Sequence, residues 1–296
     1  MRRRLFTERP VSRLAIWARR VALFSLAATI IAVIIVRSGA LDIVPALSTL
    51  AGALVLACVA ILLAFGAGVA IWRDGVEGGR HVATALIIGV LLIAYPAYLG
   101  IRAWHLPAIY DVTTDPIDPP QFDAIARLRP RDANPVSYAG LYTAELQHTA
   151  YSDIEPDDTT STPQEAYDAA MKIVIKRRWR VVDAHPPQGP SPRIIDARAP
   201  LASSTRDGII EAVARTPILG FRDDVVVRVR PTTDGARIDV RSASRYGRHD
   251  LGTNAKRVRN LIDDVDDLLA TPQPEKKPAP APTAHPQANK SNQAKR

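Results

Sequence analysis

The first third of the chain contains three apolar stretches without a single charged side chain, at residues 21–36, 43–72 and 82–101. A helix needs about 20 mostly apolar residues to cross about 30 Å of hydrocarbon. The pattern therefore predicts three transmembrane helices, which together form an anchor over residues 21–104. Everything after Trp104 is expected to be a domain in water that this anchor holds at a membrane.

The apolar stretches favour an anchor over a channel or a transporter. Transporters usually place ionisable side chains inside the membrane, and these stretches contain none. A cleaved signal peptide is an alternative for the first stretch, with residues 38–40 as a small-residue cleavage region. A basic leader of 20 residues and Arg37 beside that region disfavour this alternative.

The arginines near the apolar stretches lie mainly on one side of the predicted membrane. Short loops rich in Lys and Arg stay in the cytoplasm. The opposite side offers only Arg37 and Arg102. We therefore expect a bacterial inner-membrane protein with residues 1–20 as a cytoplasmic tail and residues 105–270 as a periplasmic domain. The arginines on the predicted cytoplasmic side are Arg2, Arg3, Arg4, Arg9, Arg13, Arg19, Arg20, Arg73 and Arg80.

The net charge of +8 belongs to this membrane topology and does not indicate nucleic acid. Residues 1–104 hold 11 basic and four acidic residues, whereas residues 105–296 hold 27 basic and 26 acidic residues. The domain is thus nearly neutral, and the expected partner is the lipid bilayer. The single cysteine, Cys58, falls in the second apolar stretch, so the domain has no disulfide.

Periodicity in the domain predicts an α+β fold. Thr162, Pro163 and Glu165 form the sequence of a capping box and start one helix, and an apolar stripe over residues 250–269 marks a second. We expect a two-layer sandwich of helix, four-stranded mainly antiparallel sheet, and helix. The four strands are predicted at residues 179–184, 208–215, 222–230 and 236–244.

The remaining segments carry weaker signals. Residues 107–161 are rich in Pro, Asp and Thr, which favours an extended path with one short helix at 122–128. The Pro-rich stretch at 185–207 is expected to be a surface loop. Residues 271–296 lack hydrophobic periodicity and are expected to form a disordered tail.

Strict alternation in the last two strands separates an apolar face from an arginine-rich face. It also places Asp223 and Asp224 on opposite faces, so they cannot act as a paired acid and base. A two-residue turn at Asp234-Gly235 would set Arg228 opposite Arg241. Such a like-charge pair would be relieved by an anion.

These arginines form the candidate site. Guanidinium groups on one sheet face could bind a phosphate or a carboxylate bidentately. The alternative without a ligand is a solvated sheet face on which these arginines pair with acidic side chains. The hypothesis predicts that Arg245→Ala abolishes anion binding and leaves stability nearly unchanged. An anionic lipid, a wall component or an envelope protein would be the partner. The candidate ligand-binding residues are Arg222, Asp224, Arg241, Arg245, Tyr246 and His249.

Catalytic and metal motifs are missing from the sequence, so we assign no catalytic residue, no metal ligand and no cofactor. The six histidines have no ligand partner at metal-binding spacing. Two other functions stay open. His249 and Asp250 could serve as base and orienter in a hydrolase or transferase, or the domain could be a scaffold in an envelope complex with an exposed apolar patch.

Five segments give the domain a family resemblance. Together they make residues from Ile109 to about Leu269 similar to the bacterial and plastid family known as domain of unknown function 1499. The resemblance implies a membrane-associated or exported domain and no assigned activity. The Pro-rich insertion at 185–207 departs from the family pattern. The segments are Asp111-Val-Thr-Thr-Asp-Pro, Ala150-Tyr-Ser-Asp-Ile-Glu-Pro, Phe221-Arg-Asp-Asp-Val-Val-Val-Arg-Val-Arg-Pro, Asp239-Val-Arg-Ser-Ala-Ser-Arg-Tyr-Gly and Asp250-Leu-Gly-Thr-Asn-Ala-Lys-Arg-Val-Arg.

Overall fold

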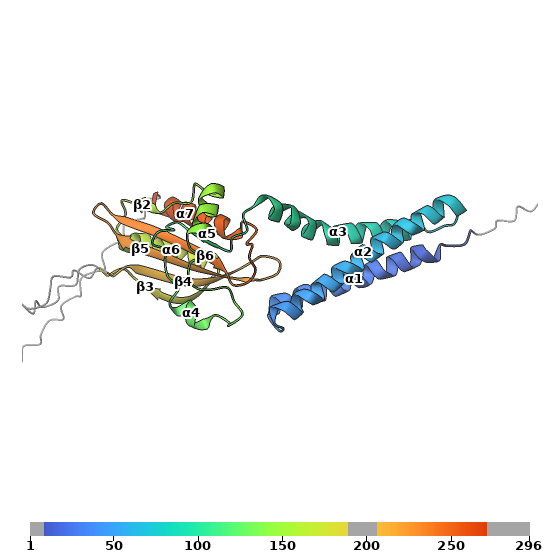
Figure 1. Cartoon of the computed structure of the whole chain (residues 1–296), viewed down its shortest axis with the longest axis horizontal. Helices are drawn as coiled ribbons and strands as arrows, with labels where there is room; N and C mark the ends of the chain where they lie inside the picture. Colours follow the sequence, from blue (N-terminus) through green and yellow to red (C-terminus); the bar gives the residue numbers. More distant parts are fainter. Residues whose placement is uncertain (1–8, 189–205, 271–296) are drawn as a thin grey trace, which may run out of the picture.

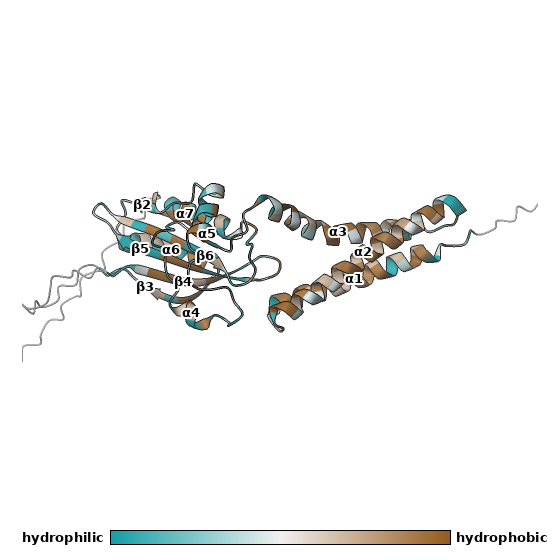
Figure 2. Cartoon of the chain, viewed as in Figure 1, coloured by the Kyte–Doolittle hydropathy of each residue, from teal (hydrophilic) through white to brown (hydrophobic). Residues whose placement is uncertain are grey.

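The computed structural model describes residues 9–188 and 206–270. Its N-terminal part consists of α1 (Arg13–Ser38), α2 (Ile43–Asp74) and α3 (Gly79–His105). All three are long and apolar enough to cross a membrane, with mean hydropathies of 2.3, 2.8 and 2.2 over their most apolar windows. Figures 1 and 2 show these helices as an apolar bundle beside a separate domain. The three predicted spans are confirmed as helices.

Small side chains let the three helices approach closely. Their shared core is made of alanines, and a β-carbon added to Gly89 of α3 would lie 2.5 Å from Cγ1 of Ile61. The hydroxyl of Ser25, which is fully buried in the bundle, donates to the carbonyl of Ala53 at 2.8 Å. Close backbone approach of this kind is how membrane helices associate. The alanines of this shared core cluster are Ala18, Ala22, Ala60, Ala64 and Ala85.

The domain is built on one antiparallel sheet, which confirms the mixed α+β class. Six strands take part instead of four, because two short strands before the first predicted one were missed. The path of the sheet is β1-β6-β5-β4-β3, and β2 also pairs with β6. The strands are β1 (Asp111–Thr113), β2 (Asp157–Thr159), β3 (Arg180–His185), β4 (Gly208–Arg215), β5 (Arg222–Pro231) and β6 (Ala236–Ser244).

Helices α6 (Pro163–Lys176) and α7 (Thr253–Ala270) cover the apolar face of the sheet. The predicted capping box is present, since Thr162 and Glu165 each bind the other's backbone amide. Helix α7 begins later than predicted because the carboxylate of Asp250 accepts hydrogen bonds from the amides of Gly252 and Asn254. Asp250 therefore precedes the helix and caps its amides.

The other face of the sheet is also covered, which the two-layer prediction missed. We call residues 114–140 the strap; they cross this face and contain the short helix α4 (Ala124–Leu128). Phe122 and Ile125 of the strap pack on the sheet around Val226. A further helix, α5 (Leu141–Ala150), follows where an extended path was expected. Most of the loop predicted at 185–207 and the tail predicted at 271–296 lie outside the described residues.

The domain contacts the helices at two places. The ring Nε2 of His249 lies 3.2 Å from the carbonyl oxygens of Ala103 and Leu106, at the end of α3. At the end of α1, the guanidinium of Arg37 donates to the carbonyls of Pro217 and Ile218 in the β4–β5 turn, at 2.6 and 3.2 Å. These contacts bring one end of the sheet against the α1–α2 turn and α3 (Figure 1).

Candidate functional site

The structure divides the six predicted site residues among three environments. Asp224, Arg241 and Arg245 are buried beneath the strap, with exposures of 0%, 0% and 2%. Arg222 and Tyr246 lie at the end of the sheet that faces the helices, and His249 lies at the contact with α3. The arginine-rich face is therefore not the solvated surface that was expected.

Arg241 is held by a buried ion pair with Asp111 of β1. Its Nε and Nη2 donate to the two carboxylate oxygens at 3.0 and 2.7 Å. The remaining donors reach the carbonyls of Pro120 and Val136 in the strap, at 3.0 and 2.8 Å. The guanidinium also lies 4.7 Å from the ring centre of Phe122. This side chain is fully occupied by contacts within the domain.

Asp224 binds two guanidinium groups at once. Arg245 donates to its Oδ1 from Nη2 at 2.7 Å, and Arg129 of the strap donates to Oδ2 from Nε at 2.6 Å. The side chain of Arg129 is 3% exposed. Alternation along β5 is confirmed here, because the neighbouring Asp223 points to the opposite face and binds Arg257 of α7 at 2.5 Å.

The β5–β6 hairpin has a longer loop than predicted. The paired strands end at Pro231 and Ala236, so residues 232–235 form the loop instead of a two-residue turn. The amide of Thr232 donates to the carbonyl of Gly235 at 3.0 Å. Gly235 has a φ of 157°, and a β-carbon there would lie 2.1 Å from the carbonyl oxygen of Thr159.

This longer loop shifts the register by two residues, and the predicted like-charge pair is wrong. Arg228 lies opposite Asp239, and Val226 lies opposite Arg241. Arg230 lies opposite another arginine, yet its Nη2 reaches Asp239 diagonally at 2.8 Å. Arg228 and Arg241 therefore form no like-charge pair that an anion would relieve.

Glu211 is a structural anchor that the sequence analysis missed. This buried carboxylate on β4 accepts hydrogen bonds from the amides of Asp123, Ala124 and Ile125 at 2.8–3.0 Å. Carboxylates stabilise the free amides at a helix start, so Glu211 fixes α4 on the sheet. No local signal could reveal it, because the partners are 86–88 residues apart in sequence.

His249 and Asp250 do not form a base and orienter pair. The Nδ1 of His249 accepts from the amide of Leu251 at 3.0 Å, so Nε2 is the nitrogen that donates to the α3 carbonyls. The Asp250 carboxylate is used to cap α7. The nearby hydroxyl of Ser242 donates to Asn254 at 2.9 Å. The hydrogen bonds of these side chains join α3, β6 and α7.

Three exposed arginines gather at the end of the sheet next to the helices, and we call them the arginine cluster: Arg180, Arg215 and Arg222. Arg215 and Arg222 are directly opposite in the β4–β5 pair. No ion pair joins any of the three to a carboxylate among the described residues. Burial, followed by the neighbouring guanidiniums of Arg215, Arg245 and Arg180, lowers the pKa of Arg222.

The arginine cluster lies against the turn between α1 and α2. A β-carbon added to Gly39 in that turn would lie 3.8 Å from Nη2 of Arg222. Tyr246 is close by: burial, with smaller contributions from Asp132 and from Asp42 before α2, raises its pKa. Two of the six predicted site residues therefore meet at this end, together with Arg180 and Arg215, which the sequence analysis did not single out.

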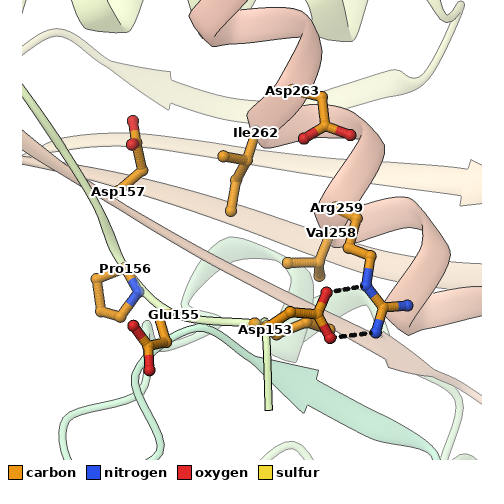
Figure 3. Close-up of a pocket in the computed structure, with 9 residues that line it drawn as sticks. Asp153, Glu155, Pro156, Asp157, Val258, Arg259, Ile262 and Asp263 are labelled. Atoms are coloured by element: carbon orange, nitrogen blue, oxygen red, sulfur yellow. Dashed lines mark hydrogen bonds and ion pairs between the residues drawn. The ribbon is translucent and has the colours of Figure 1, made fainter. Parts of the chain in front are cut away.

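A groove of about 440 Å³ lies beside α7, between this helix and residues 153–157. Figure 3 shows Asp153 facing Arg259 across one end, with the carboxylates of Asp157 and Asp263 at the other end. Both guanidinium nitrogens of Arg259 that face Asp153 are bonded to it. No three His, Cys, Asp or Glu side chains in residues 9–188 and 206–270 are placed to hold a metal ion.

A carboxyl pair beside this groove makes stability depend on pH. Burial and the adjacent Asp157, which shares a hydrogen bond with it, raise the pKa of Asp266 to about 6. A raised carboxyl pKa stabilises the fold below the ordinary value near 4, and this contribution is lost as the pH rises through 6. Asp266→Asn keeps a donor toward Asp157 without a charge.

We expect Asp266→Asn to be more stable than the wild type at pH 7.5, by about 1 kcal/mol after solvent screening of an exposed group. At pH 4 the two proteins should unfold alike, since Asp266 of the wild type is then protonated. Thermal unfolding at both pH values measures this difference. A difference of equal size at pH 4 and pH 7.5 would show that the carboxyl pair is not its cause.

The comparisons with known proteins agree with the geometry of the domain. A family model described as "Protein of unknown function (DUF1499)" matches residues 111–265, more than half of the chain, so the chain belongs to this family. The match starts at β1 and ends within α7. No curated protein and no solved structure matches the chain.

Proposed function

We propose that this member of the DUF1499 family is a bacterial inner-membrane protein that binds an anionic group at the arginine cluster. The three helices serve as its anchor, and the domain lies in the periplasm. The bound group is a phosphate or a carboxylate, held by guanidiniums that form paired hydrogen bonds with either. In this proposal the domain acts as a binding module.

The uncompensated charge of the arginine cluster carries the proposal. Elsewhere in the domain, guanidiniums beneath the strap are matched by carboxylates, as in Arg241 with Asp111 at 2.7 Å. Arg215 and Arg222 instead face each other across two strands, and no carboxylate in residues 9–188 and 206–270 forms an ion pair with either. Like charges in directly opposite positions destabilise a sheet, so an anion between them would relieve repulsion and stabilise this end of the domain.

The distribution of arginines along the chain supports the orientation. Nine arginines fall before α1, within its first turns, or at the adjoining ends of α2 and α3, whereas only Arg37 and Arg102 lie at the opposite ends of the helices. A loop rich in Arg stays cytoplasmic. The domain is attached at the Arg37 and Arg102 end, which corresponds to the periplasm in a bacterium.

We expect inorganic pyrophosphate to stabilise the full chain reconstituted in phosphatidylcholine nanodiscs. At ten times the dissociation constant, binding to the folded state contributes about 1.4 kcal/mol, or roughly 3–6 °C in Tm. The double variant Arg215→Gln/Arg222→Gln should lose this shift. Differential scanning fluorimetry, with sodium chloride added to match ionic strength, measures the effect.

Lys172→Gln is the matched control, because Lys172 is an exposed cation on α6, which covers the other face of the sheet. It should respond to pyrophosphate like the wild type. An equal response in the wild type and in the double variant would refute the arginine cluster as an anion site.

A further inference from the structure

The turn between β4 and β5 carries no charged side chain, and hydrogen bonds join its two ends. Residues 216–221 read Thr-Pro-Ile-Leu-Gly-Phe. The amide of Thr216 donates to the carbonyl of Phe221 at 2.9 Å, and the amide of Gly220 donates to the carbonyl of Thr216 at 3.1 Å. The amide of Phe221 donates to the Thr216 hydroxyl at 2.9 Å. At its tip, Ile218 is 44% exposed. Each backbone group that is bonded within the turn lowers the cost of placing the turn in an apolar medium.

The same turn lies at the depth where the first apolar helix ends. The carbonyls of Pro217 and Ile218 accept hydrogen bonds from Arg37, which follows directly after the uncharged stretch 21–36. A β-carbon on Gly220 would lie 3.0 Å from Cγ of Arg37. Since α1 is long enough to cross a membrane, these contacts put the turn at the boundary between hydrocarbon and head groups.

The arginine cluster flanks this apolar turn on both sides. Arg215 is the last residue of β4 and Arg222 is the first residue of β5, so the two arginines border the turn at its two ends. Arg180 begins the neighbouring strand. An apolar tip bordered by cations is the arrangement by which surfaces bind bilayers that contain anionic lipids.

From these contacts we infer that the ligand of the arginine cluster is the phosphate head group of an anionic lipid in the membrane that holds α1–α3. The β4–β5 turn enters the interface of that membrane beside the head group. This inference rests on the proposed function for the anion site. The insertion of the turn stands on the separate contacts of Arg37 and on the exposure of Ile218.

Insertion is tested by fluorescence in the full chain, after Cys58→Ser removes the native thiol. An environment-sensitive NBD label on Ile218→Cys should be quenched by lipids that carry a nitroxide near the top of the acyl chain. Ile117→Cys is the matched control. Ile117 is 96% exposed, but it lies beside Asp115, which binds Arg230 near the far end of β5, about 25 Å along the strand from Arg222.

Quenching at position 218 and not at 117 supports insertion, and equal quenching at both positions contradicts it. Lipid selection is tested in nanodiscs of mixed phosphatidylglycerol and phosphatidylcholine, by native mass spectrometry of the released protein. We expect phosphatidylglycerol to be enriched on the wild type and on Lys172→Gln. Its preference should fall by roughly tenfold in Arg215→Gln/Arg222→Gln, because each cation near an anionic surface contributes severalfold.

The possible results separate the inference from the proposed function. If pyrophosphate stabilises the protein but phosphatidylglycerol is not enriched, the site takes a soluble anion and the lipid inference is wrong. If neither ligand distinguishes the wild type from the double variant, the anion site itself is refuted, whatever the quenching at position 218 shows.

Discussion

Replacing Asp224 with alanine is expected to lower the free energy of unfolding of the domain by about 3–5 kcal/mol, the usual cost of leaving buried charge without a partner. Two guanidiniums depend on this carboxylate, those of Arg129 and Arg245, and their side chains are 3% and 2% exposed. Arg129 also ties the strap to the sheet, so its release should loosen residues 114–140.

Urea unfolding of the full chain in mild detergent, followed by circular dichroism, measures this loss. Asp153→Ala provides the control, since Asp153 and Arg259 form an ion pair on the surface, where the two side chains are 54% and 36% exposed. We expect that control to cost less than about 1 kcal/mol. Similar losses in the two variants would mean that the carboxylate of Asp224 is not buried as described.

The second large effect is expected from Arg241→Met, which should also destabilise the domain by about 3–5 kcal/mol. The substitution removes both bonds to Asp111 and the donors to two strap carbonyls. Burial already raises the pKa of Asp111. Without its partner the pKa should rise further, so protonation in acid relieves the buried charge, and the loss of stability should be smaller at pH 5 than at pH 8.

A double variant separates the loss of the ion pair from the cost of leaving one buried charge without its partner. In Asp111→Leu/Arg241→Met both ionic groups are gone, and apolar side chains of similar size often substitute for a buried ion pair without loss. We therefore expect the double variant to be more stable than Arg241→Met alone. Strictly additive losses would show that the two side chains do not act as a pair.

Local patterns were sufficient to predict the three membrane helices, α6, α7 and the four longer strands, but not β1, β2 or α5. Uncharged stretches located α1–α3, and the capping sequence at Thr162 located α6 to the residue. Alternation along β5 correctly separated Asp223 from Asp224, because successive side chains of a strand point to opposite faces. Each of these signals is contained within a few residues of the element that it describes.

Contacts between distant segments could not be predicted in the same way. The strap carries no hydrophobic periodicity that would show it lying on the arginine-rich face, and its anchors join residues far apart, such as Arg129 and Asp224, 95 positions away. The hairpin register depended on loop length, and residues 232–235 offered a plausible two-residue turn inside a longer loop. The wrong loop length therefore shifted every predicted residue pair between β5 and β6.

The sequence therefore identified only part of the candidate site. Arg222 and Tyr246 were chosen for residue type and do lie at an exposed end, whereas Arg241 and Arg245 have the same chemistry and are buried. Alternation gives the face of a strand but not whether another segment covers that face. Arg180 and Arg215 had no local signal, because only the sheet order brings their strands beside Arg222.

The most direct test of this account compares two arginine variants in the pyrophosphate titration. We predict that Arg245→Ala is less stable than the wild type but keeps the increase in Tm with pyrophosphate, because Arg245 is bound to Asp224 beneath the strap. Arg215→Gln/Arg222→Gln should fold normally and lose that increase. A full response in the double variant, together with a lost response in a normally stable Arg245→Ala, would contradict the account.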